Sequence, residues 1–129
     1  MAVRKWAHEA EFDDDATSVS RARAFVTLHL LDHDLDRLVD DLQLVVSELA
    51  TNALLHGGTG FFVVLLAVDD AVRLEVRDGS DAVPIEIEAR TLDVGGRGVA
   101  IVSTLSRDWG VTAQISGGKA VWAEFSRAV

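Results

Sequence analysis

The spacing of apolar residues predicts two amphipathic helices in the first half of the chain. From Thr17 or Ser18, either of which is a suitable N-cap, apolar residues recur at three- and four-residue steps to about residue 31. A segment with three aspartates then breaks the pattern, and a second helix is expected from about residue 36 to residue 55. Gly57 and Gly58 should end it, because glycine readily adopts the left-handed conformation of a helix C-cap.

The period of two that is typical of strands occurs at both ends of the chain and in its middle. Residues 5–12 and 72–77 alternate apolar and polar positions, and residues 61–68 form a continuous apolar run. A short turn at residues 69–71 joins the last two into an antiparallel hairpin, and Gly117-Gly118 predicts a second hairpin from residues 109–116 and 119–126. Residues 99–105 should form a short helix, after a long polar loop of the kind that is often functional.

Together these elements predict an α+β two-layer sandwich, in which about three helices cover one face of a mixed or antiparallel sheet of about five strands. A chain of 129 residues corresponds to one domain, residues 1–129. The absence of cysteine excludes disulfides and thiolate metal sites, and a net charge of −9 argues against a nucleic-acid partner. No apolar stretch is long enough for a signal peptide or a membrane span, so a cytoplasmic protein is expected.

Glu48 and Asn52 are the first candidates for chemistry. They are four residues apart on the second predicted helix, hence about 40° apart around its axis, and His56 follows one turn later. A carboxylate can take a proton from a nucleophile, and a carboxamide oxygen can bind a hard cation such as Mg²⁺. The same spacing also occurs on ordinary solvated helix faces, so this pair alone decides nothing.

Two glycine-containing segments are further candidates. Asp78 ends a predicted strand, where its carboxylate can accept a hydrogen bond from an amino group of a flat ligand, and Gly79 leaves room for that ligand; an ordinary Asp-Gly turn is the alternative. Gly96-Arg97-Gly98 leads into the short helix that opens on Gly98 just before Val99, and N–H groups at a helix N-terminus favour phosphate. The pattern matches neither the Rossmann nor the Walker motif.

The order of these segments resembles the ATP-binding Bergerat fold that gyrase, histidine kinases and related ATPases share. Residues 47–57 look like its N box, residues 76–80 like its adenine-contacting box, and residues 96–102 like its second glycine box. Within that superfamily the chain is most similar to the small stand-alone ATP-binding proteins of actinobacteria, relatives of the anti-sigma-factor serine kinases. Residues 107–111 and 118–123 add to the likeness, which covers essentially the whole chain.

This resemblance implies ATP and Mg²⁺ as cofactors and a role for each candidate. Glu48 would be the general base, Asn52 the Mg²⁺ ligand and Asp78 the acceptor for the adenine amino group. The remaining nucleotide-binding residues would be Gly79, Gly96, Arg97, Gly98 and Val99.

In two places the sequence departs from the family pattern. Ser80 stands at the second glycine of the adenine box, and Ala120 is expected where many relatives carry a threonine that helps to hold the adenine.

The resemblance further implies a serine/threonine protein kinase that acts in trans. Its partners would be an anti-anti-sigma (STAS-type) protein as substrate and a sigma factor as the sequestered protein, and a homodimer stays open. The alternatives are a non-catalytic, nucleotide-gated binding module and a structural protein with a degenerate site.

Several other residues are expected to have ordinary roles. His29 and His33 are spaced as a possible metal pair, but with no third ligand evident they are expected on the solvated side of the first helix. The tryptophans should pack in the core or at a sheet edge. Arg21 and Arg23 should face solvent and are the first candidates for a partner interface.

Overall fold

The computed structural model describes residues 5–57, 60–79, 97–114 and 117–127. Gly96 and Ser80 therefore lie outside the described residues, as does most of the long polar loop. In chain order the elements are β1 (Ala7–Phe12), α1 (Thr17–Asp32), the short 3-10 helix η1 (Asp36–Leu38), α2 (Val39–Gly57), β2 (Phe61–Val68), β3 (Ala71–Asp78), α4 (Arg97–Leu105), β4 (Asp108–Ala113) and β5 (Lys119–Ser126).

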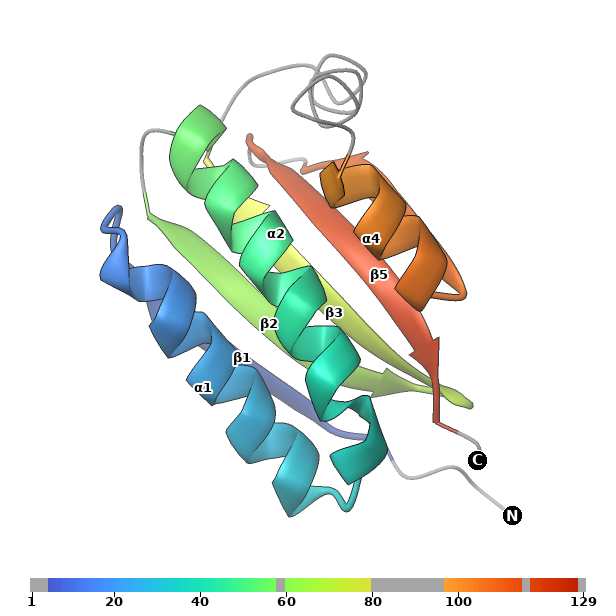
Figure 1. Cartoon of the computed structure of the whole chain (residues 1–129). Coiled ribbons are helices and arrows are strands. Elements are labelled where there is room, and N and C mark those ends of the chain that lie inside the picture. Colours follow the sequence, from blue (N-terminus) through green and yellow to red (C-terminus); the bar gives the residue numbers. More distant parts are fainter. Residues whose placement is uncertain (1–4, 58–59, 80–96, 115–116, 128–129) are drawn as a thin grey trace.

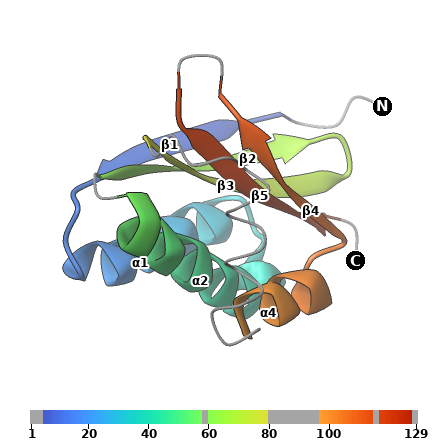
Figure 2. The same cartoon turned by 90° about the horizontal axis from the view of Figure 1, so that it is seen from above.

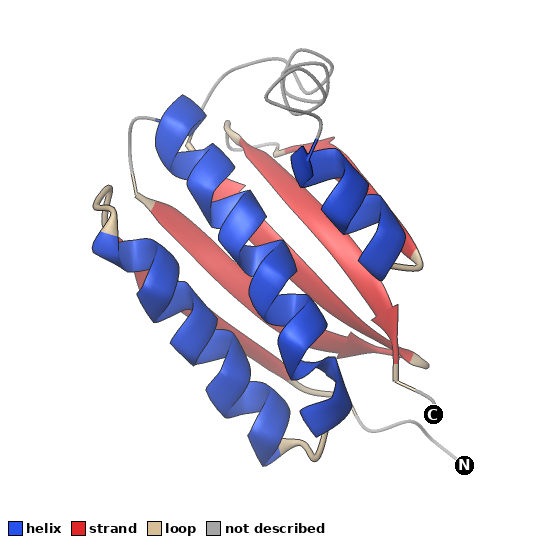
Figure 3. Cartoon of the chain, viewed as in Figure 1, coloured by secondary structure: helices blue, strands red, loops and turns tan. Residues whose placement is uncertain are grey.

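The strands form one sheet in the order β1-β2-β3-β5-β4, and every neighbouring pair is antiparallel. The helices α1, α2 and α4 all lie on one face of this sheet (Figures 1 and 3). Seen from above, the opposite face carries no helix among the described residues (Figure 2). The predicted two-layer α+β sandwich is confirmed, with an antiparallel rather than a mixed sheet.

The core lies between the helices and the sheet, and alternation along each strand decides which side chains enter it. In β2 the residues Phe61, Val63 and Leu65 point toward the helices and are fully buried. Their partners across the ladder in β3 include Val76 and Leu74, which are buried in the same layer. Burial of each such side chain contributes about 1.5–3 kcal/mol, so the central strands and α2 supply much of the core.

The start of α1 differs from the prediction. Thr17 and Ser18 are not the N-cap but the first two helical residues, and Ala16 precedes them. The Asp15 carboxylate accepts hydrogen bonds from the Thr17 backbone N–H (2.8 Å) and hydroxyl (2.9 Å), while the Ser18 hydroxyl donates to the Asp13 carbonyl (2.8 Å). The bond from the Thr17 backbone N–H is the main reason that the pKa of Asp15 lies below its usual value.

The expected solvent exposure of the α1 histidines is also wrong. The His33 ring stacks on Trp6 with 3.9 Å between centroids, and the His29 ring stacks on His8 at 3.8 Å. His8 and His33 are joined by a 2.8 Å contact between their Nε2 atoms. The edge strand β1 therefore covers this side of α1, and within the described ranges no group of side chains suited to holding a metal ion is found.

The other expectations about single residues hold in part. Trp6 and Trp109 pack against the core, whereas Trp122 lies on the open face of the sheet, 4.2 Å below the Arg73 guanidinium. Arg21 and Arg23 are exposed on α1, as predicted. No helix in the described part of the chain has the length and apolar character that crossing a membrane requires.

Candidate functional site

One end of the sheet brings most of the predicted site residues together. Asp78 is the last residue of β3, and it lies across the ladder from Phe61, the first residue of β2, and from Lys119, the first residue of β5. The C-terminal end of α2 and the N-terminal end of α4 lie at the same end of the molecule (Figure 1). The ends of β3, α2 and α4, which are far apart in the sequence, thus lie at one end of the molecule (Figure 1).

The orientation of α2 decides where Glu48 and Asn52 point. The Gln43 side-chain amide donates to the Thr27 hydroxyl of α1 at 2.7 Å, which fixes the side of α2 that faces α1. At 100° per residue, Glu48 lies about 140° and Asn52 about 180° around the helix from Gln43. Both half-buried side chains therefore lie on the side away from α1, where α4 packs on α2 (Figure 1).

Asp78 points to this same face of the sheet. It shares the alternation of Val76 and Leu74, which are buried beneath the helices. Its carboxylate oxygen Oδ2 is 2.6 Å from Lys119 Nζ, and only 2% of the Asp78 side chain and 3% of the Lys119 side chain are exposed. The two residues form a buried ion pair, the kind of interaction that persists only when each charge is compensated.

Lys119 is a site residue that sequence reasoning missed, because Gly-Gly-Lys was taken only as the turn of a hairpin. A signal was present nevertheless. Along β5 the inward positions are Lys119, Val121, Ala123 and Phe125, so a lysine stands where the strand pattern requires an apolar residue. Such a position predicts a buried partner of opposite charge.

The strand register corrects the expectation for Ala120. Ala120 lies opposite Arg77 and points to the open face, away from the Asp78 carboxylate. A shift of one residue along a strand moves a side chain to the other face of the sheet, so Lys119 and not Ala120 occupies the place beside Asp78. The side chain that this hairpin places beside Asp78 is therefore the cation of Lys119.

Gly118 fixes the position of this pair. Its φ of +83° is readily available only to glycine, and a Cβ atom here would collide with the Asp78 carbonyl oxygen. The turn consequently packs directly against the end of β3, which holds the Asp78 and Lys119 backbones in register.

The start of α4 agrees with the predicted phosphate-binding segment in position. The helix begins at Arg97, one residue before the expected opening at Gly98, and Gly98 and Val99 lie in its first turn. Its N-terminal end faces the end of the sheet that carries Asp78 (Figure 1). Backbone N–H groups at a helix N-terminus, together with the helix dipole, favour an anionic ligand.

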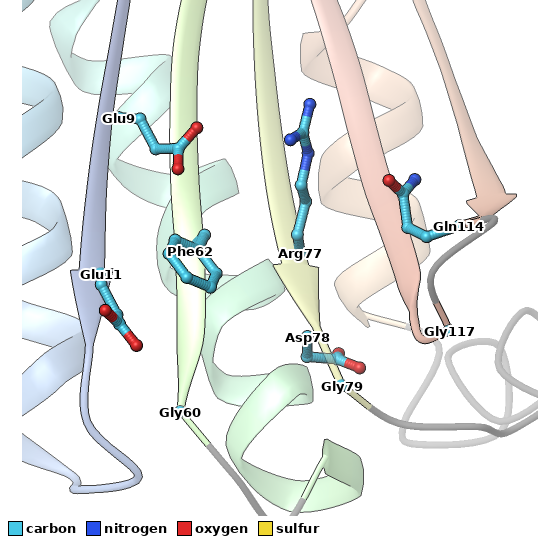
Figure 4. A pocket seen from close by; sticks show the side chains of 9 residues that line it. All are labelled: Glu9, Glu11, Gly60, Phe62, Arg77, Asp78, Gly79, Gln114 and Gly117. Atoms are coloured by element: carbon cyan, nitrogen blue, oxygen red, sulfur yellow. The ribbon is translucent and has the colours of Figure 1, made fainter.

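A pocket of about 450 Å³ lies at the same end of the sheet and opens on the face without helices (Figure 4). Its lining includes Glu9 of β1, Phe62 of β2 and Arg77 of β3, and also Asp78 and Gly79, two of the predicted site residues. Glu9, Phe62 and Arg77 alternate with the core-facing positions, so this part of the pocket lies across the sheet from Glu48 and Asn52. No residue of α2 is among the described residues that line it.

A family model described as the histidine kinase-like ATPase domain matches residues 12–125 of the chain. The chain belongs to this family. Membership supports an ATP-binding regulatory function, and ATP in this family is usually bound together with Mg²⁺. A search of curated proteins finds no match to the chain.

The donor chemistry of the site suits these ligands. Asn52 and Glu48 offer carboxamide and carboxylate oxygens, the donors that Mg²⁺ prefers, on the side of α2 that faces α4. Asp78 offers an acceptor for an amino group, and the α4 N-terminus offers N–H donors for phosphate.

Proposed function

We propose that this histidine kinase-like ATPase domain is a serine/threonine protein kinase of the anti-sigma-factor type. The observation that carries the proposal is the orientation of α2, which directs Glu48 and Asn52 away from α1 and toward α4, on the face of the sheet to which Asp78 points. A base, a cation ligand and an acceptor for the nucleobase are thus available to one bound nucleotide.

In this proposal each side chain has one task. The Asn52 carboxamide oxygen holds Mg²⁺, which when bound neutralises charge on the phosphates. Glu48 accepts the proton of a serine or threonine hydroxyl of the partner. The hydroxyl oxygen forms a bond to the γ-phosphorus as the bond from that phosphorus to the bridging oxygen breaks, and ADP leaves. Alignment and charge neutralisation supply most of the rate enhancement in such transfers.

The expected substrate is an anti-anti-sigma protein of the STAS type, and the sequestered protein is a sigma factor; both follow from the family resemblance. Arg21 and Arg23 are exposed on α1, the helix that covers the side of α2 opposite to Glu48. A contact there would leave the nucleotide site accessible to the substrate serine.

Phosphate transfer from labelled ATP to a candidate STAS protein, measured beside calorimetric ATP binding, tests the proposal. Glu48→Gln should bind Mg-ATP with unchanged affinity and lose transfer by about 100-fold or more. Asn52→Ala should weaken binding in the presence of Mg²⁺ and have little effect without it. Asp40→Asn, an exposed carboxylate of the same helix, is the matched control and should behave as wild type.

Each other outcome has a definite meaning. Wild-type transfer by Glu48→Gln would remove Glu48 as the base. ATP binding by the wild-type protein without labelling of any STAS partner would favour the nucleotide-gated binding module. Absence of ATP binding at millimolar concentration would contradict the proposal as a whole.

A further inference from the structure

Lys119 has more hydrogen-bonding capacity than its surroundings use. An ammonium group carries three N–H donors, and one of them is directed to Asp78 Oδ2. Within the described residues Asp78 is the only acceptor bonded to Nζ. Only 3% of the Lys119 side chain is exposed. The neighbouring inward positions of the two strands are apolar, namely Val76 and Val121. Because a buried donor without an acceptor is costly, this site favours a ligand that brings one.

The pair presents an acceptor and a donor side by side. The Asp78 carboxylate oxygen and the Lys119 nitrogen are 2.6 Å apart, comparable to the spacing of neighbouring polar atoms on the edge of a nucleobase. Adenine offers the complementary order on its Watson–Crick edge, with an amino donor at N6 next to the acceptor N1. Guanine offers the reverse order, an O6 acceptor next to an N1–H donor, which would set acceptor against carboxylate and donor against ammonium.

We propose that Lys119 is a second base-reading residue of the nucleotide site, which donates from Nζ to adenine N1 while Asp78 accepts from the N6 amino group. The inference rests on the proposed placement of the base at Asp78. It assigns a specificity-determining role to the cation that lies beside Asp78.

A purely structural role for Lys119 leads to the opposite result. If the ammonium only neutralises Asp78, it competes with the adenine amino group for the carboxylate, and its removal should strengthen ATP binding. If it reads N1, its removal should weaken binding. The sign of the change, read together with the response to a nucleotide that lacks N1, therefore separates the two roles.

The wild-type protein and three nucleotides give the first test, by calorimetry with Mg²⁺ present. We expect 1-deaza-ATP, in which a C–H group replaces N1, to bind about 10-fold more weakly than ATP, since a hydrogen bond to a charged donor is lost. GTP should bind about 10- to 100-fold more weakly than ATP. Equal affinities for ATP and 1-deaza-ATP would overturn the proposal, and this comparison needs no variant to fold.

Variants of Lys119 give the second test. Lys119→Met should weaken ATP binding about 10-fold and make the affinities for ATP and 1-deaza-ATP equal, whereas Lys119→Arg, which keeps a charged donor, should retain part of the difference. Lys5→Met changes the other lysine of the chain, which is exposed, and should alter neither value. Tighter ATP binding by Lys119→Met would overturn the proposal.

The two proposals fail in different ways. If wild-type protein binds ATP and transfers phosphate but does not distinguish ATP from 1-deaza-ATP, only the role of Lys119 is wrong. If it binds no nucleotide at all, both the base reading by Lys119 and the proposed kinase function are wrong.

Discussion

Separating the charges of the buried Asp78–Lys119 pair should destabilise the fold far more than removing both. Lys119→Met keeps the length of the side chain and leaves the Asp78 carboxylate buried without its cation. Asp78→Leu leaves the ammonium buried without its anion. With side-chain exposures of only 3% and 2%, solvent screens neither charge, so removing one member of the pair should be costly.

The expected magnitude follows from the cost of an uncompensated buried charge. Each single variant should lose about 3–5 kcal/mol of unfolding free energy, whereas the double variant, with two apolar side chains of similar volume, should come within about 1 kcal/mol of wild type or exceed it. For a domain of this size about 4 °C of melting temperature corresponds to 1 kcal/mol, so each single variant should melt about 12–20 °C lower.

Urea unfolding of the nucleotide-free protein at pH 7, followed by tryptophan fluorescence and circular dichroism, measures this cycle. The matched control is the exposed pair Arg107–Asp70, joined by a 3.0 Å contact, for which alanine variants should show no measurable coupling. If the losses of Lys119→Met and Asp78→Leu add within about 1 kcal/mol in the double variant, the two charges are not stabilised by each other and the reasoning is refuted.

Two further predictions concern α1 and the last hairpin. Burial, and to a smaller extent the neighbouring His8, lower the pKa of His29 below 6.5. The unfolded chain therefore takes up this proton more readily than the folded protein does. The contribution of His29 to stability should be complete above about pH 6.5 and be lost as the pH falls through the lower folded-state pKa. Urea midpoints from pH 8 to 5 should fall less for His29→Phe than for wild type, and parallel curves would contradict this. Gly118→Ala should lower the melting temperature in a thermal scan, because Gly118 has a φ of +83° and an added Cβ atom would collide with the Asp78 carbonyl oxygen. An unchanged melting temperature would contradict this prediction.

The sequence alone determined the elements and their layer arrangement. The steps of three and four residues in α1 and α2, and the alternation in β3, report which side of each element is apolar, and burial of those sides requires helices on one face of a sheet. It also determined the kinds of chemistry available, because the carboxylate of Glu48, the carboxamide of Asn52 and the carboxylate at the end of β3 are fixed by residue type and local position.

Only the tertiary structure decided which of these groups meet. Asp78 and Lys119 are 41 residues apart, and their contact depends on the register between β3 and β5 and on the turn at Gly118, which local periodicity does not specify. The stacking of His29 on His8 likewise required β1 to lie beside α1. Periodicity describes one element at a time, whereas the pairing of distant elements is set by the joint packing of all of them; a shift of one residue would have put Ala120, and not a buried cation, beside Asp78.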